Sequence, residues 1–137
     1  MAGFKDFREI AAWQIAHEAK IRVDEFLSRP DFKRHYKFSD QLSDAARSAP
    51  RNIAEGFARF KHKEFAQFVR IAKGSEAEVL NHLIDARDQN LITEDELLQT
   101  EWLLKRALKA ANGLIRWLES NPDPPPPRYK PKPSKAP

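Results

Sequence analysis

The sequence predicts an all-α protein, an antiparallel up-down four-helix bundle followed by a proline-rich tail. Apolar residues recur at steps of three and four along four segments with short connections, which is typical of packed antiparallel helices. No segment alternates with period two, so strands are not expected. Eight of the ten prolines lie after Asn121. We therefore expect residues 1–120 to form the bundle and residues 121–137 a disordered tail.

The first helix is expected from Phe7 to Leu27. Asp6 with Glu9 three residues later resembles a capping box, and Pro30 is expected to stop the helix. Apolar residues wrap around more than one face of this segment, which is more than the surface helix of a monomer needs. Part of this face, including Trp13, is therefore a candidate contact with another subunit.

The second helix is expected to begin at Ser39, as its N-cap, and to extend to about Phe60. Pro50 lies inside it. Proline lacks the amide proton that would bond to the carbonyl of Ala46, and its ring crowds that carbonyl, so we expect a kink.

The third helix is expected from His62 to about Gln89, and two of its residues are unusual. Glu76 lies on the apolar stripe, where its carboxylate must find a partner, reach solvent or lie between subunits, because burial without a partner is costly. Gly74 costs about 1 kcal/mol relative to alanine inside a helix. It is either a close-contact point for a neighbouring subunit or an ordinary weak point on the surface.

The fourth helix is expected to start at a capping box formed by Thr93 and Glu96 and to end near Ser120. It has the most regular apolar period in the chain, and a second apolar stripe lies beside the first. This surplus predicts self-association. The candidate oligomer contacts are Trp13, Leu103, Ala110, Trp117 and Gly74.

Composition excludes several classes of protein. The chain has 137 residues, no cysteine, and no apolar run long enough to span a bilayer. Acidic residues interrupt the N-terminal stretch where a signal peptide would be apolar, so the cytoplasm is the expected location. No nucleophile elbow, phosphate-binding loop or paired Glu-x-x-His motif occurs. We therefore expect no enzymatic activity, no cofactor, no metal site and no membrane partner.

Basic residues in and around the second and third helices are candidates for nucleic-acid binding, because phosphate contacts need several cations on one surface. The net charge is +4, but the tail has four basic residues and one acid, so the bundle itself is nearly neutral. The alternative is a solvated face with weak ion pairs. The candidate residues are Arg47, Arg51, Arg59, Lys61, Lys63, Arg70 and Lys73.

A polar strip adjoins the apolar face of the second helix. Ser48, Asn52, Glu55 and Arg59 follow at steps of four, three and four, and could form a recognition strip. Alternatively, Ser48 and Asn52 satisfy backbone groups freed by Pro50 while Glu55 pairs with Arg59.

Four stretches of the sequence are distinctive: FKDFREIAAWQIAHE, ARDQNL, NGLIRWL and the motif S-x-P-x-N-I-A-E-G-x-x-R from Ser48 to Arg59. In these stretches the chain resembles a bacterial family first noticed as open reading frames within intervening sequences of large-subunit ribosomal RNA genes. The resemblance implies a four-helix fold, a ring of five subunits and no established enzymatic activity. It also implies kinship to accessory proteins of diversity-generating retroelements, which bind nucleic acid and a reverse transcriptase.

The chain departs from that family in three places. Members usually have leucine at the position of Glu76, a small polar cap near Phe60 and Lys61, and a turn glycine near Asn90. Asparagine tolerates the left-handed conformation that such a turn uses. These differences concern local details of the fold.

The sequence thus favours a non-enzymatic homo-oligomeric interaction module, pentameric by resemblance, whose partner is another copy of itself. The alternative is an accessory protein that binds RNA or DNA through the basic residues. The tail is interpreted either as a ligand for aromatic grooves or as an unstructured solubilising end.

Overall fold

The computed structural model describes residues 4–125 and 133, and those residues are helical or irregular, without a strand. The predicted helical bundle is thus confirmed in its class. The predicted tail lies mostly outside the described residues. The elements are the 3₁₀ turn η1 (Phe7–Glu9) and the helices α1 (Ala11–Leu27), α2 (Pro30–Arg34), α3 (Tyr36–Phe57), α4 (His62–Asp88) and α5 (Glu94–Ser120).

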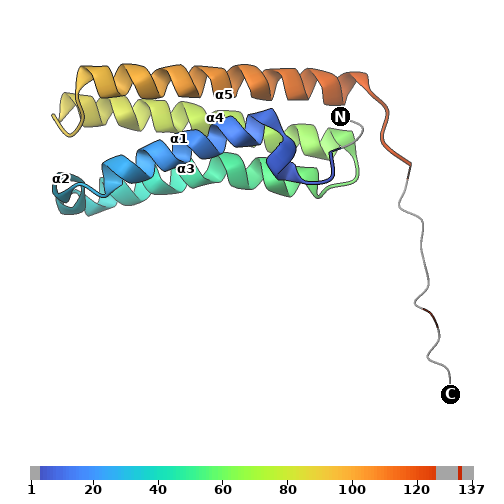
Figure 1. Cartoon of the computed structure of the whole chain (residues 1–137), viewed down its shortest axis with the longest axis horizontal. Coiled ribbons are helices and arrows are strands. Elements are labelled where there is room, and N and C mark those ends of the chain that lie inside the picture. The colour runs from blue at the N-terminus through green and yellow to red at the C-terminus, as the bar shows by residue number, and fades with distance from the viewer. Residues whose placement is uncertain (1–3, 126–132, 134–137) are drawn as a thin grey trace.

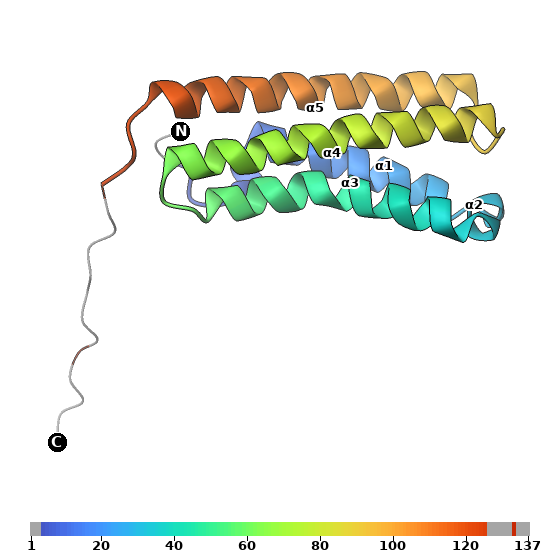
Figure 2. The same cartoon turned by 180° about the vertical axis from the view of Figure 1, so that it is seen from behind.

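The four long helices lie side by side, and successive long helices are joined at opposite ends of the assembly (Figures 1 and 2). Helix α1 packs against α3 and α5, and α4 packs against the same two helices. The surface between α1 and α5 is therefore opposite the surface between α3 and α4. Both termini of the helical part and the α3–α4 connection lie at one end, and α2 lies at the other.

The N-terminal prediction was wrong in its detail. Asp6 and Glu9 do form a capping box, but it caps η1, and α1 begins only at Ala11. The reason is Ile10, whose extended backbone (φ −80°, ψ 123°) separates the two elements. The chain turns at Ile10, and the Ile10 side chain is buried and contributes to the core.

The expected stop at Pro30 was also incomplete, because Pro30 starts the short helix α2. Proline is favourable in the first turn of a helix, where its missing amide proton costs nothing. Helix α3 then begins at Tyr36, ahead of the expected cap at Ser39. The hydroxyl of Ser39 instead donates to the carbonyl of Phe32 (2.6 Å) and ties α2 to α3.

The α4–α5 connection follows the expected turn chemistry. Asn90 has φ 61°, the left-handed conformation that asparagine tolerates, and the amide of Leu91 donates back to the carbonyl of Ala86 (2.8 Å). The predicted capping box of Thr93 and Glu96 is present in both directions. Helix α5 therefore starts where the local sequence predicts.

The interior consists of two apolar clusters. One includes Phe26, Phe32 and Leu83 and lies towards the α2 end. The other includes Ile10 and Phe65 and lies towards the end where α3 connects to α4. The two clusters meet at small side chains that line a small cavity beside Glu76: Ala19 and Ala46 of the first cluster, and Ala16 and Ala49 of the second.

Candidate functional site

An apolar groove runs between α1 and α5. Its volume is about 520 Å³, and its lining residues are Glu18, Arg22, Leu98, Gln99, Trp102 and Leu103. Leu98 is 51% exposed and Trp102 is 60% exposed. Ile21, on the same helix as Glu18 and Arg22, is 45% exposed. Large apolar side chains gathered at a groove are typical of an interaction surface.

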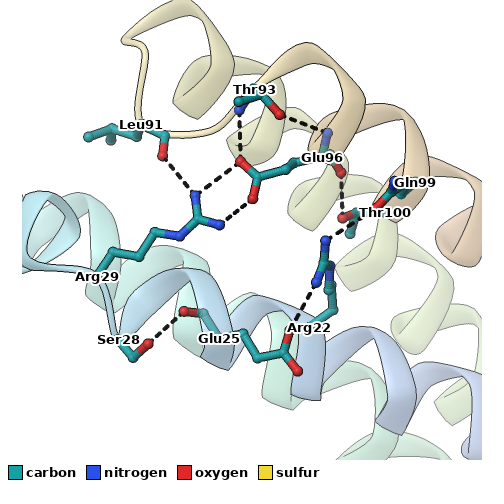
Figure 3. Close-up of polar contacts among 9 residues, drawn as sticks. All are labelled: Arg22, Glu25, Ser28, Arg29, Leu91, Thr93, Glu96, Gln99 and Thr100. Atoms are coloured by element: carbon teal, nitrogen blue, oxygen red, sulfur yellow. Dashed lines mark hydrogen bonds and ion pairs between the residues drawn. The ribbon is translucent and has the colours of Figure 1, made fainter.

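Polar contacts fix the two walls of this groove relative to each other (Figure 3). The Arg22 guanidinium, on α1, donates to Gln99 Oε1 on α5 (3.2 Å) and to Glu25 Oε2 (3.0 Å). Beyond the end of α1, Arg29, the N-cap residue of α2, donates to both carboxylate oxygens of Glu96 on α5. The groove therefore has walls that are held in place before any partner binds.

The contact with Arg29 also changes the titration of Glu96. The hydrogen bond from the guanidinium lowers the pKa of the Glu96 carboxyl to about 2, and bonds within the Thr93 cap act in the same direction. Glu96 thus keeps its charge at any ordinary pH. Its carboxylate both caps the start of α5 and binds Arg29 in the connection between α1 and α2.

The residues predicted as oligomer contacts lie in different surroundings. Leu103 lines the groove. Trp13, Ala110 and Trp117 are half-buried and pack against the core of their own chain. The Trp13 ring stacks on His17 with centroids 4.6 Å apart. Gly74 is exposed, and a Cβ placed there would meet nothing within 4 Å.

Sequence reasoning missed Leu98 and Trp102, the two exposed large apolar residues that line the groove. Their spacing of four places them on one side of α5, next to Leu103, and this was an available signal. The glycine in close contact with a neighbouring helix is Gly56, which was also missed. A Cβ at Gly56 would lie 2.7 Å from Phe65 Cδ1 and 2.8 Å from Phe68 Cβ on α4.

The polar strip of α3 divides into an inner and an outer pair. Asn52 donates its amide protons to the carbonyl (2.8 Å) and hydroxyl (3.0 Å) of Ser48, and the hydroxyl of Ser75 on α4 donates to Ser48 Oγ (2.7 Å). Glu55 and Arg59 are exposed and pair with each other at 3.3 Å. The four residues therefore do not form one surface strip, and the inner pair joins α3 to α4.

The seven basic candidates do not share one face. Arg47 pairs across to Asp24 on α1 (3.0 Å), whereas Arg70 pairs with Glu119 on α5. These contacts direct two of the cations to opposite edges of the bundle. Arg59, in the α3–α4 connection, pairs with Glu55 at the end of α3 and lies over the Phe68 ring. Lys73 is half-buried, and Arg51, Lys61 and Lys63 are exposed without an ion pair among the described residues.

Glu76 is buried in the middle of the bundle. The side chain is 2% exposed, and neither carboxylate oxygen has a hydrogen-bond partner among the described residues. It borders a cavity of about 10 Å³, lined by residues from all four long helices. Burial away from water raises the pKa of this carboxyl to about 8, although Lys73 acts in the opposite direction. Glu76 is therefore mainly protonated at neutral pH.

Two searches of the described residues bear on other kinds of site. No group of three or more histidine, aspartate or glutamate side chains is placed so that it could hold a metal ion. No described helix is both long and apolar enough to cross a membrane.

Comparison with known proteins identifies the family. A search of curated proteins found no match. The family model described as 23S rRNA-intervening sequence protein matches residues 8–113. This match covers most of the helical part, including the Ser48 to Arg59 motif, the groove of α1 and α5, and Glu76. The chain therefore belongs to the 23S rRNA-intervening sequence protein family.

Proposed function

We propose that this protein is a non-enzymatic homo-oligomeric interaction module of the cytoplasm, and that copies assemble through the groove between α1 and α5. In this proposal each copy is an antiparallel up-down four-helix bundle with α3 bent at Pro50. The expected assembly is a ring of five copies, as the family resemblance implies. The exposure of Leu98 and Trp102 at the groove is the observation that supports the proposal.

The physical reason is the apolar surface that a single copy leaves in water. Burying a leucine side chain contributes about 1.5–3 kcal/mol relative to leaving it exposed, and tryptophan is common at the centre of interfaces. Arg106 lies over the Trp102 ring at 4.7 Å, so the ring is presented with a cation beside it. Arginine and tryptophan together are typical of residues that dominate binding energy.

The test is the molar mass in solution, measured by light scattering for Leu98→Glu and Trp102→Glu. We expect the wild-type chain to give an oligomer and both variants to give the monomer mass, because a buried unpaired carboxylate is costly. The matched control is Ile71→Glu on α4, since Ile71 is 52% exposed and lies outside the groove. A monomeric wild-type chain, or equal masses for all four proteins, would contradict the proposal.

A second candidate function is nucleic-acid binding, supported by the exposure of Arg51, Lys61 and Lys63 without ion pairs among the described residues. In this function the contacts are made to phosphates, so binding to RNA or DNA should weaken steeply with salt. Arg51→Glu should weaken it further. Arg47→Glu is the matched control, because Arg47 already pairs with Asp24. Equal binding by both variants would exclude Arg51 from the contact.

A further inference from the structure

A second hollow lies at the end of the bundle where α3 connects to α4. Its volume is about 470 Å³, and its aromatic lining comes from Phe4, Phe57, Phe60, Phe65 and Trp117. The other wall is formed by prolines of the segment that follows α5, Pro122, Pro124 and Pro125. Figures 1 and 2 show this segment leaving α5 at the same end as the α3–α4 connection.

Polar contacts hold the start of this segment against α4. The amide of His62 donates to Asp123 Oδ1 (2.8 Å), and His62 Nδ1 lies 3.0 Å from the carbonyl oxygen of Asn121. The side-chain amide of Asn121 in turn donates to the carbonyl of Trp117 (2.8 Å). Lys61, the N-cap residue of α4, has no side-chain capping bond. Asp123 therefore supplies the cap of α4 from 61 residues away in the sequence.

The prolines beyond Asp123 are held less firmly. Pro124 and Pro125 are exposed, so they border the hollow without filling it. Phe60 is 38% exposed and faces the same space. Grooves lined by aromatic side chains recognise proline-rich segments, because such segments are already extended and lose little entropy on binding.

We propose that this aromatic hollow is a proline-recognition site, and that its occupant is the segment Pro122–Pro127 of a second copy of the chain. The chain itself indicates this occupant, since its own prolines after α5 border the hollow and Asp123 accepts from the amide of His62. Every copy carries both the site and its ligand, and exchange of an identical element is a low-cost route to association. The segment within the same chain competes, because its tether gives it a high effective concentration.

This proposal does not rest on the groove between α1 and α5. The hollow lies at the end of the bundle and shares no lining residue with that groove. A chain that proved monomeric in the light-scattering test could still bind the segment, and an oligomeric chain could fail to bind it. The two proposals are therefore tested separately.

The test uses a fluorescein-labelled peptide of sequence NPDPPPPR, titrated with the full chain while fluorescence anisotropy is measured. In the wild-type chain the internal segment competes, so binding should be weak. In Asp123→Ala the internal segment loses its anchor and the amide of His62 becomes free for the aspartate of the peptide. A hydrogen bond to a charged group corresponds to about tenfold or more in affinity, so this variant should bind at least about fivefold more tightly.

Two protein variants and two altered peptides distinguish binding at this site from nonspecific attraction. Phe60→Ser removes exposed lining without touching the core and should weaken peptide binding in the Asp123→Ala background. Tyr36→Ser, at the opposite end of the bundle and 65% exposed, should leave it unchanged. The peptide NPAPPPPR, which lacks the aspartate, should bind Asp123→Ala no more tightly than it binds the wild-type chain. Equal binding by wild type and Asp123→Ala, equal binding of NADAAAAR, or no binding to either protein would overturn the proposal.

Discussion

Replacing Glu76 by leucine should stabilise the protein, by an amount that the titration of the buried carboxyl sets. The native pKa is about 8 and the ordinary value is 4.5. Each pKa unit corresponds to about 1.36 kcal/mol, so the mismatch costs about 3 kcal/mol at pH 7. Leucine carries no charge and needs no hydrogen-bond partner, and the described part of the chain provides none for the carboxylate at this position. We therefore expect Glu76→Leu to raise the free energy of unfolding by about 3 kcal/mol at pH 7.

The pH dependence of the free energy of unfolding shows whether the ionisation of Glu76 causes this difference in stability. The native state keeps the proton of Glu76 up to about pH 8, whereas the unfolded chain releases it above about pH 4.5. The wild-type free energy of unfolding should therefore fall as pH rises between these values, relative to Glu76→Gln, which cannot ionise. Urea unfolding at fixed protein concentration measures both, with Glu78→Gln, exposed on the same helix, as the control. Parallel pH profiles for wild type and Glu76→Gln would refute the reasoning.

Two other predictions follow from local geometry. Gly56→Ala should lower the free energy of unfolding, measured by urea unfolding, by about 1–3 kcal/mol, because the added Cβ would lie 2.7 Å from Phe65 Cδ1. Gly74→Ala should raise the free energy of unfolding by about 1 kcal/mol, because a Cβ there meets no described atom within 4 Å and alanine favours the helix. The opposite result at either glycine would contradict this packing. Glu96→Gln should lower the free energy of unfolding by about 1–3 kcal/mol at pH 7 and by less towards pH 2. The reason is that the pKa of Glu96 is lowered in the native state, so the stabilisation by its charge is lost as pH falls. A loss in thermal unfolding that does not change with pH would show that the charge is not involved.

The parts of the fold that depend on neighbouring residues were predictable. The start of α5 follows from a capping box completed by Thr93 and Glu96, and the turn before it follows from the tolerance of Asn90 for positive φ. The end of the first helix before Pro30 was predicted correctly, whereas the start of α2 at Pro30 was not, because it depends on how Phe32 packs in the core. The local sequence therefore predicted which segments are helical more accurately than it predicted the residue at which each helix begins.

The candidate sites depend on residues distant in the sequence and were harder to predict. The spacing of Leu98 and Trp102 shows that they are neighbours on α5, but it does not show that α1 leaves them uncovered. Nor can the sequence tell Gly56 from Gly74, because crowding depends on the Phe65 side chain of another helix. For Glu76 the sequence left three alternatives open. In the single chain, the packing of four helices buries the Glu76 side chain, and its carboxylate has no hydrogen-bond partner among the residues that the structure describes.

The separation of the interior into two apolar clusters has a consequence for how the protein opens. The four long helices run through both clusters, which meet at alanines around the small cavity beside Glu76. Small side chains give little contact area where the clusters meet, so we expect the two halves to open separately, with amide hydrogen exchange near Phe26 changing little when the packing near Phe65 is disturbed. A copy could then loosen the half that holds the proline segment while the half around α2 keeps its native packing.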